Sequence, residues 1–223
     1  DYFDDIAKHS GKVRATDITK VLDATANQVG RNLDQGVLKF RFKGVLSGKS
    51  NYSTLSSPVE WLVRAGLIYK VGIADTPQYP LSAYTKTNAF KLYLFDTGIL
   101  GALTGIPITV LYQDHYGTAK GAIAENMALQ LLVNDSEHNT YSWQKNTAEI
   151  EYLLSYHDKL VPLEVKASHR TRARSLDSYL KRYKPELAVI LSDNPIRFDS
   201  KRRILFCPNY FAEDLDTLTK RYL

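Results

Sequence analysis

The order of elements predicted after residue 117 constrains the fold most. Five predicted strands cover residues 139–143, 149–156, 160–167, 187–191 and 204–206. The predicted helices among and around them cover residues 120–133, 172–183 and 210–222. Strands that alternate with helices on this scale indicate one sheet with helices packed on it. We therefore expect residues 117–223 to form an α/β domain with a mixed central sheet.

The first 116 residues read differently, as helices followed by strands. Helices are predicted over residues 2–8, from Thr16 or Asp17 onward, and from Ser57-Pro58 to a left-handed stop at Gly66. Strands are predicted over 67–71 and 90–95, and in the second of these three apolar residues alternate with Lys91 and Tyr93. This is the order of a winged helix. The whole chain is therefore expected to be α+β, with a winged-helix module over 1–116.

Composition favours an ordinary globular protein of the cytoplasm. Hydrophobic residues make up 44% of the chain and charged residues 24%. The single cysteine, Cys207, excludes an internal disulfide and a cysteine-based zinc site. The longest uncharged stretch, residues 97–113, contains Pro107, so no membrane-spanning helix is expected. The chain opens on Asp1 without a methionine or an export signal, and we expect a longer protein upstream.

The surplus of positive charge is concentrated in one segment. The chain has 29 basic and 24 acidic residues, a net charge of +5. Between Lys159 and Lys184, eight basic residues stand against two acidic ones. Such a patch attracts a phosphate backbone because neutralised phosphates release counterions. The residues expected to contact nucleic acid are Arg170, Arg172, Arg174, Lys181 and Arg182. The alternative is a solvated helix face without a partner.

Three familiar kinds of site are disfavoured by the sequence: a phosphate-binding loop, a zinc hydrolase site and a serine hydrolase site. Residues 44–50 read G-V-L-S-G-K-S, one residue short of a phosphate-binding loop. The five histidines show no i, i+4 pair, and no G-x-S-x-G serine accompanies them. Zinc hydrolase and serine hydrolase chemistry are therefore disfavoured.

The informative residues are acidic. Glu125 shares a face of its predicted helix with alanines and leucines, so its carboxylate is aimed at an apolar interface. Two predicted strands meet at a turn at His157-Asp158, and in that hairpin residues whose numbers sum to 315 lie opposite each other. Glu151 then faces Glu164, and Glu149 faces Lys166.

Two carboxylates directly opposite each other are costly unless a positive group lies between them. Glu125, Glu151 and Glu164 could supply oxygen ligands to Mg²⁺ or Mn²⁺. A bound metal would activate water and stabilise charge on a phosphorane, with Lys166 orienting the nucleophile or neutralising the transition state. The catalytic candidates are therefore Glu151, Glu164 and Lys166. The alternative is that these are exposed polar positions of a half-buried hairpin.

Glu125 on a helix, Glu151 on a strand and Glu164-Val165-Lys166 on the next strand resemble the PD-(D/E)xK pattern of restriction endonucleases and Holliday-junction resolvases. More closely, the chain resembles the C-terminal region of a group of bacterial and archaeal AAA-type ATPases. The motifs that carry this resemblance are Trp61-Leu62, Ala65-Gly66-Leu67-Ile68, Pro80-Leu81, residues 90–98, Gly121 to Asn126, Tyr141-Ser142-Trp143, residues 149–152, residues 162–167 and Ser175 to Tyr179.

The resemblance implies an upstream ATPase module that binds ATP, followed by a winged-helix segment and a restriction-endonuclease-like domain. The leading expectation for function is a chain that engages nucleic acid through the basic segment and the wing, with metal-dependent phosphodiester cleavage as its candidate chemistry. One departure is that the middle acid is usually Asp, so Glu151 either moves the metal or marks the loss of cleavage. The alternative function is a catalytically silent nuclease-fold module that docks on the ATPase or on a partner protein and regulates it.

Overall fold

The computed structural model describes residues 12–31, 39–48, 50–107, 109, 112, 117–134, 140–156, 158–169 and 173–223. The α-helices in this part of the chain are α2 (Lys12–Arg31), α3 (Tyr52–Arg64), α4 (Thr97–Thr104), α5 (Gly117–Asn134), α6 (Arg174–Tyr183) and α7 (Leu215–Thr219). The short 3₁₀ helices are η2 (Leu81–Tyr84) and η4 (Asn209–Ala212). The strands are β1 (Ile68–Ala74), β2 (Thr85–Leu94), β3 (Tyr141–Lys145), β4 (Ala148–Tyr156), β5 (Lys159–Val165), β6 (Ala188–Ser192), β7 (Arg197–Asp199) and β8 (Ile204–Pro208).

All eight strands belong to one sheet, in the order β2-β1-β3-β4-β5-β6-β8-β7. The pairs β1–β3, β5–β6 and β6–β8 are parallel, and the other neighbours are antiparallel. The predicted α+β class with a mixed sheet is therefore confirmed. The more specific winged-helix and restriction-endonuclease-like assignments stay predictions. β1 pairs with β3, so the sheet continues from the first 116 residues into the rest of the chain.

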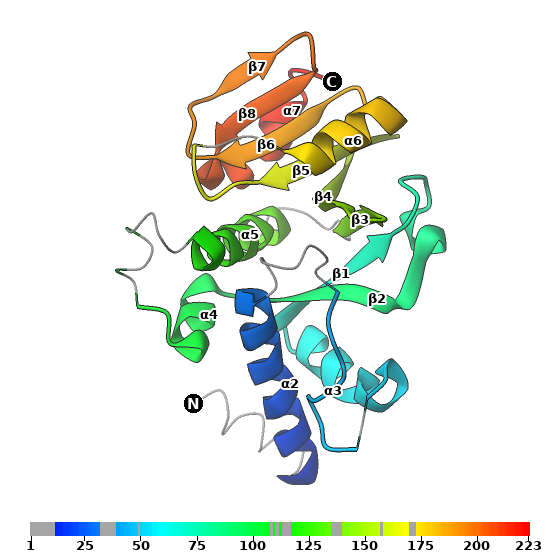
Figure 1. Ribbon diagram of the computed structural model, residues 1–223, viewed down its shortest axis with the longest axis vertical. Coiled ribbons are helices and arrows are strands. Elements are labelled where there is room, and N and C mark those ends of the chain that lie inside the picture. The colour runs from blue at the N-terminus through cyan, green and yellow to red at the C-terminus, as the bar shows by residue number, and fades with distance from the viewer. Residues whose placement is uncertain are drawn as a thin grey trace.

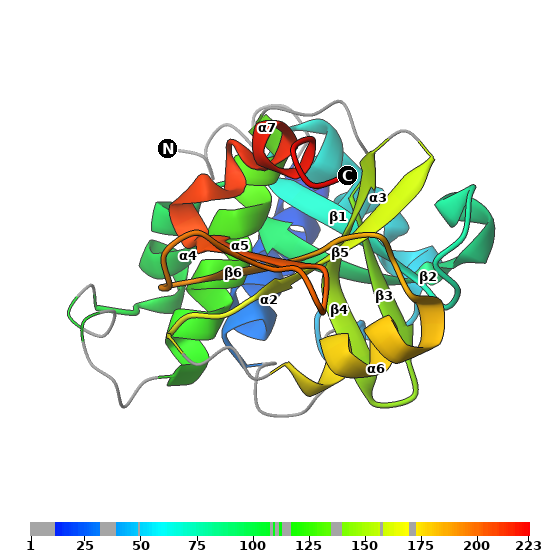
Figure 2. The same cartoon turned by 90° about the horizontal axis from the view of Figure 1, so that it is seen from above.

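Helices cover both faces of the C-terminal half of the sheet. Figure 2 shows β5 and β6 passing between α5 and α7 on one side and α6 on the other. On the first side, Leu129 of α5 packs in one core with Tyr152 and Leu163. On the second side, Tyr179 of α6 packs against Trp143, with ring centroids 5.0 Å apart. Because both faces are buried, β5 and β6 are largely apolar along their length.

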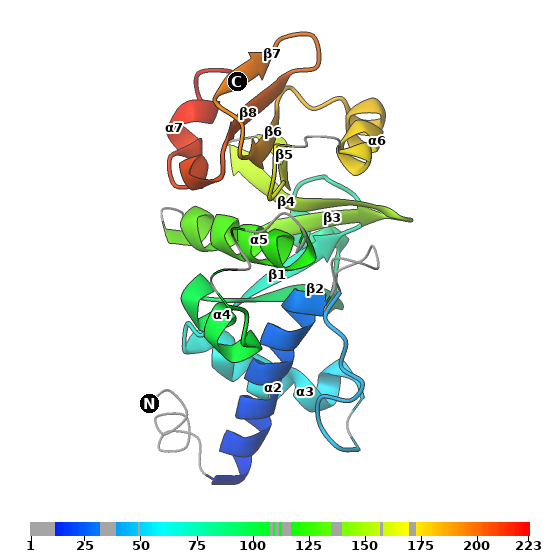
Figure 3. The ribbon, with the colours of Figure 1, turned by 60° about the vertical axis from the view of Figure 1, so that its left-hand side comes forward.

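A third core lies at the other end of the molecule, where α2, α3 and α4 pack against β1 and β2 (Figure 1). Leu55, Val59 and Leu62 of α3 are fully buried there. In Figure 3, α5 lies between these N-terminal helices and the C-terminal strands. Among the described residues, no helix combines the length and apolar character needed to cross a membrane.

Two predicted helix starts were wrong. α2 begins at Lys12, which places Thr16 and Asp17 inside the helix. α3 begins at Tyr52, because the Asn51 side chain caps it by accepting a hydrogen bond of 3.1 Å from the backbone N–H of Thr54. Pro58 therefore lies within α3. The predicted stop at Gly66 is confirmed by its φ of +69°. The helix predicted over residues 2–8 lies outside the described residues.

Candidate acidic site

The hairpin of β4 and β5 has the predicted register. Its five residue pairs run from Tyr156 opposite Lys159 to Tyr152 opposite Leu163, and the numbers in each pair sum to 315. Glu151 and Glu164 are the next residues along the two strands, and Glu164 lies close enough to raise the pKa of Glu151. The sequence therefore placed these two carboxyl groups together correctly.

A bulge in β4 sets the direction of Glu151. Two residues of β4, Glu151 and Tyr152, stand opposite the single residue Ser142 of β3. The Ser142 hydroxyl donates a hydrogen bond of 2.8 Å to the carbonyl of Ile150 inside this irregularity. Bulges bend a strand and re-aim side chains, and they are frequent beside functional sites. Here Tyr152 joins the core under α5, whereas Ile150 joins the core under α6.

Glu125 lies on the buried face of α5, as its spacing predicted, and is 5% exposed. Its carboxylate accepts a hydrogen bond of 3.3 Å from the Tyr93 hydroxyl of β2. Its backbone carbonyl accepts one of 2.9 Å from the Tyr152 hydroxyl of β4. Two tyrosines from separate strands therefore hold this turn of α5 above the sheet.

Lys166 follows β5 directly and lies beside Glu164. Its Nζ is 2.5 Å from Glu164 Oε1, and the side chains are 27% and 4% exposed. Glu164 is therefore the inner member of the pair, and Lys166 is its partly exposed partner. The predicted approach of Lys166 to Glu149 was wrong, because Glu149 forms an ion pair with Lys91 instead.

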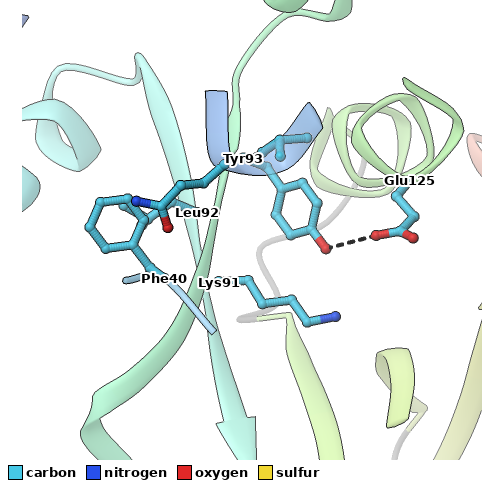
Figure 4. Close-up of a pocket in the computed structure, with 7 residues that line it drawn as sticks. Phe40, Lys91, Leu92, Tyr93 and Glu125 are labelled. Atoms are coloured by element: carbon cyan, nitrogen blue, oxygen red, sulfur yellow. Dashed lines mark hydrogen bonds between the residues drawn. The ribbon is translucent and has the colours of Figure 1, made fainter. Parts of the chain in front are cut away.

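Lys91 is the site residue that the sequence analysis missed. It lies in β2, is 2% exposed, and forms its ion pair with the largely buried Glu149. Figure 4 shows Lys91 and Tyr93 extending from β2 toward Glu125 on α5. The alternation of residues 90–94 correctly put Lys91 on the face opposite the apolar residues. That face is also buried, and a lysine and a tyrosine in the otherwise apolar second half of the strand were the available signal.

The four carboxyl groups and the two lysines of this region form one acidic cluster, in which the charged groups influence one another. Its members are Glu125, Glu149, Glu151, Glu164, Lys91 and Lys166. Burial raises the pKa of Glu125 to about 7, and Glu149 adds to this, while Lys91 and Tyr93 oppose it. Burial and the neighbouring Glu164 raise the pKa of Glu151 well above its ordinary range. These interactions show that the carboxyl groups lie close enough to compete for protons.

The pKa values of the two lysines are raised, although burial by itself would lower them. Burial alone would lower the pKa of Lys91, but the nearby carboxylates outweigh it and raise that pKa. The same balance, with Glu164 and Glu151 as the main carboxylates, raises the pKa of Lys166. Both lysines are therefore charged at neutral pH and act as fixed cations of the cluster.

The fit to a divalent cation rests on two oxygen atoms. Glu151 Oε2 and Glu164 Oε2 are buried and lack a hydrogen-bond donor among the described residues. Buried carboxylate oxygens normally have a donor or a cation as partner, so this pair fits a hard cation. Within the described ranges, no three acidic, histidine or cysteine residues converge as a preformed metal site. Glu125 instead faces Tyr93 and Lys91.

The predicted basic residues divide into two groups. Arg174, Lys181 and Arg182 are exposed on α6, whereas Arg170 and Arg172 lie outside the described residues. Lys181 lines an open groove of ≈ 490 Å³ with Lys201 and Arg202, which precede β8. The sequence analysis missed Lys201 and Arg202 because they are distant in the chain. Arg202 also forms an ion pair with Asp177 of α6.

This basic groove lies at the opposite end of β5 from Glu164. The Ala188 N–H that begins β6 donates to the carbonyl of Arg203, next to Arg202. Lys159, at the start of β5, reaches Glu186 near that same edge, with Nζ and Oε2 2.6 Å apart. Glu164 is five positions after Lys159 along β5, or about 17 Å at the rise of a strand. Lys181, which lines this groove, therefore lies away from Glu164 along the sheet.

Comparison with known protein families agrees with part of the sequence interpretation. Residues 120–210 match a family described as a domain of unknown function (DUF4143), which is often found with AAA-type ATPases. Residues 1–109 match a second family, also described as a domain of unknown function (DUF8612). Neither family is described as a nuclease or a winged helix. No curated protein and no solved structure matches the chain.

Proposed function

We propose that this chain engages nucleic acid as the C-terminal part of an AAA-type ATPase, and that its acidic cluster is a metal-dependent phosphodiesterase site. The observation that carries the proposal is the pair of buried, donor-free oxygens of Glu151 and Glu164 beside the ammonium of Lys166. The match of residues 120–210 to a domain found with AAA-type ATPases supports the placement.

Glu151 and Glu164 would hold Mg²⁺ or Mn²⁺. Glu125 lies on α5, which packs on the same sheet. When bound, such a cation lowers the pKa of a coordinated water and stabilises negative charge on phosphate oxygens. Lys166 is positioned by Glu164 and is 27% exposed, so it can contact a phosphate oxygen from the open side. The basic groove at α6 would hold the nucleic acid backbone farther along the sheet.

Cleavage of duplex, branched and single-stranded DNA in Mn²⁺ tests the proposal. We expect wild-type protein to cleave at least one of these substrates, and Glu164→Gln to lose roughly 100-fold or more in rate. Lys166→Met should lose activity while retaining metal binding. Glu213→Gln, which removes an exposed carboxylate outside the cluster, should behave as wild type.

A silent docking module is the second candidate, and the burial of Lys91 favours it. A lysine that is 2% exposed and paired with Glu149 can serve as internal structure without any substrate. This candidate predicts that all three DNA substrates remain intact in Mn²⁺. It also predicts salt-insensitive binding to the ATPase module, whereas binding to DNA weakens steeply with salt.

A further inference from the structure

Lys91 places a positive charge inside the acidic cluster from a different part of the chain. It lies in β2, within residues 1–109, whereas the four carboxylates of the cluster and Lys166 belong to residues 120–210. Besides its ion pair with Glu149, its charge interacts with those of Glu125 and Glu151. The cluster is therefore assembled from both family-matched segments.

The surroundings of Lys91 are fixed and leave little space on one side of it. The Asn126 side chain bonds both backbone groups of Leu94, which fixes α5 against β2 three residues away from Lys91. The pocket beside Lys91, Tyr93 and Glu125 measures ≈ 20 Å³. That volume holds about one water molecule, whereas Mg²⁺ usually keeps several waters of its own. A hydrated cation therefore does not fit in this pocket.

Charge balance points the same way. Glu125, Glu149, Glu151 and Glu164 carry four negative charges when ionised, and Lys91 and Lys166 carry two positive ones. The difference of two negative charges equals the charge of one divalent cation. Without Lys91 the cluster would hold three uncompensated negative charges, which favours additional cation or proton binding.

We propose that Lys91 is a resident cation of the acidic site, which occupies the side of Glu149 and Glu125 so that the site takes a single divalent cation at Glu151 and Glu164. This rests on the proposed function, since it concerns the same cluster. Lys91 is a positioning residue, because it contacts carboxylates and not the substrate. The number of metal ions bound by residues 120–210 then depends on a side chain from residues 1–109.

Mn²⁺ titration of the 223-residue chain tests the inference, with bound metal counted by electron paramagnetic resonance and affinity measured by calorimetry. Wild-type protein should bind one Mn²⁺ at this site. Lys91→Met should bind a second Mn²⁺ or bind the first roughly tenfold tighter, because a nearby charge shifts such equilibria by one or more log units. Lys70→Met removes a lysine that pairs with Glu60 outside the cluster and should match wild type.

Glu149→Gln gives an independent reading if Lys91→Met does not fold. With Glu149 neutral, the charge of Lys91 acts more fully on Glu125 and Glu151, and Mn²⁺ affinity should fall roughly tenfold. Two Mn²⁺ ions in wild-type protein, unchanged Mn²⁺ affinity in Glu149→Gln, or folded Lys91→Met with both the wild-type number of Mn²⁺ ions and the wild-type affinity would overturn the role of Lys91 and leave the metal site standing. Wild-type protein that binds no Mn²⁺ would instead remove the proposed metal site itself.

Discussion

The side chain of Asn126 bonds to the backbone of Leu94 as a neighbouring strand would. Its Nδ2 donates to the Leu94 carbonyl and its Oδ1 accepts from the Leu94 N–H, both at 2.9 Å. Asn126 is fully buried. One helical side chain thus extends the hydrogen bonding of β2 and fixes α5 beside it, next to Glu125.

Asn126→Ala should destabilise the protein by about 2–4 kcal/mol, because it leaves a buried donor and a buried acceptor of Leu94 unpaired. Urea unfolding followed by circular dichroism measures the loss. Gln130→Ala is the matched control on the same helix, since its partner Thr97 is only partly buried. A loss no larger than that of the control would show that water replaces the amide at Leu94.

The stability of the metal-free protein should fall as pH rises toward and through 7. Glu125 has an ordinary pKa of 4.5, which the fold raises to about 7. The folded protein thus favours the protonated form, and this contribution is complete below the ordinary pKa and is lost as pH rises through the folded pKa. Glu151 acts in the same direction. Unfolding free energies from pH 5 to 8 in the presence of EDTA measure the trend.

Glu125→Gln should flatten that pH profile, because its amide does not ionise. It should also be the more stable protein at pH 8, where wild type must bury a charged carboxylate. Glu213→Gln, an exposed change, should retain the wild-type slope. Identical slopes in Glu125→Gln and wild type would assign the pH dependence to other groups.

Removal of Lys181 and Lys201 should weaken DNA binding in a salt-dependent manner. Both line the groove between α6 and the turn before β8. If each contacts one duplex phosphate, Lys181→Ser with Lys201→Ser should lower the slope of log K against log salt by about 1.8. Lys86→Ser, at an exposed position of β2, is the control. An unchanged slope would place the nucleic acid elsewhere on the protein.

Cys207 should report global unfolding. Its side chain is fully buried in β8, and burial raises the pKa of the thiol to about 12. Because the thiolate is the reactive form, a thiol reagent at pH 8 should label native protein very slowly. Labelling should become fast across the same urea range in which circular dichroism reports unfolding. Rapid labelling without urea would reveal local opening of β8.

Local pattern predicted much of the second half of the fold. The period-two alternation and the single turn at His157-Asp158 set the register of β4 and β5, and hence the approach of Glu151 to Glu164. The spacing of α5 likewise predicted that Glu125 is buried. These features depend on residues near one another in the chain, so local spacing was enough to predict them.

Tertiary structure alone decided the rest of the site. Whether the second face of β2 meets water or α5 depends on a contact between segments more than thirty residues apart, as the bond from Asn126 to Leu94 shows. Because of that contact, Lys91 is a buried cation and not the polar position that was expected. Glu149 pairs with Lys91 and not with Lys166. The groove of Lys181 and Lys201 likewise arises where α6 meets the turn before β8. Residue spacing does not predict such contacts, because burial and charge pairing depend on which elements pack against each face.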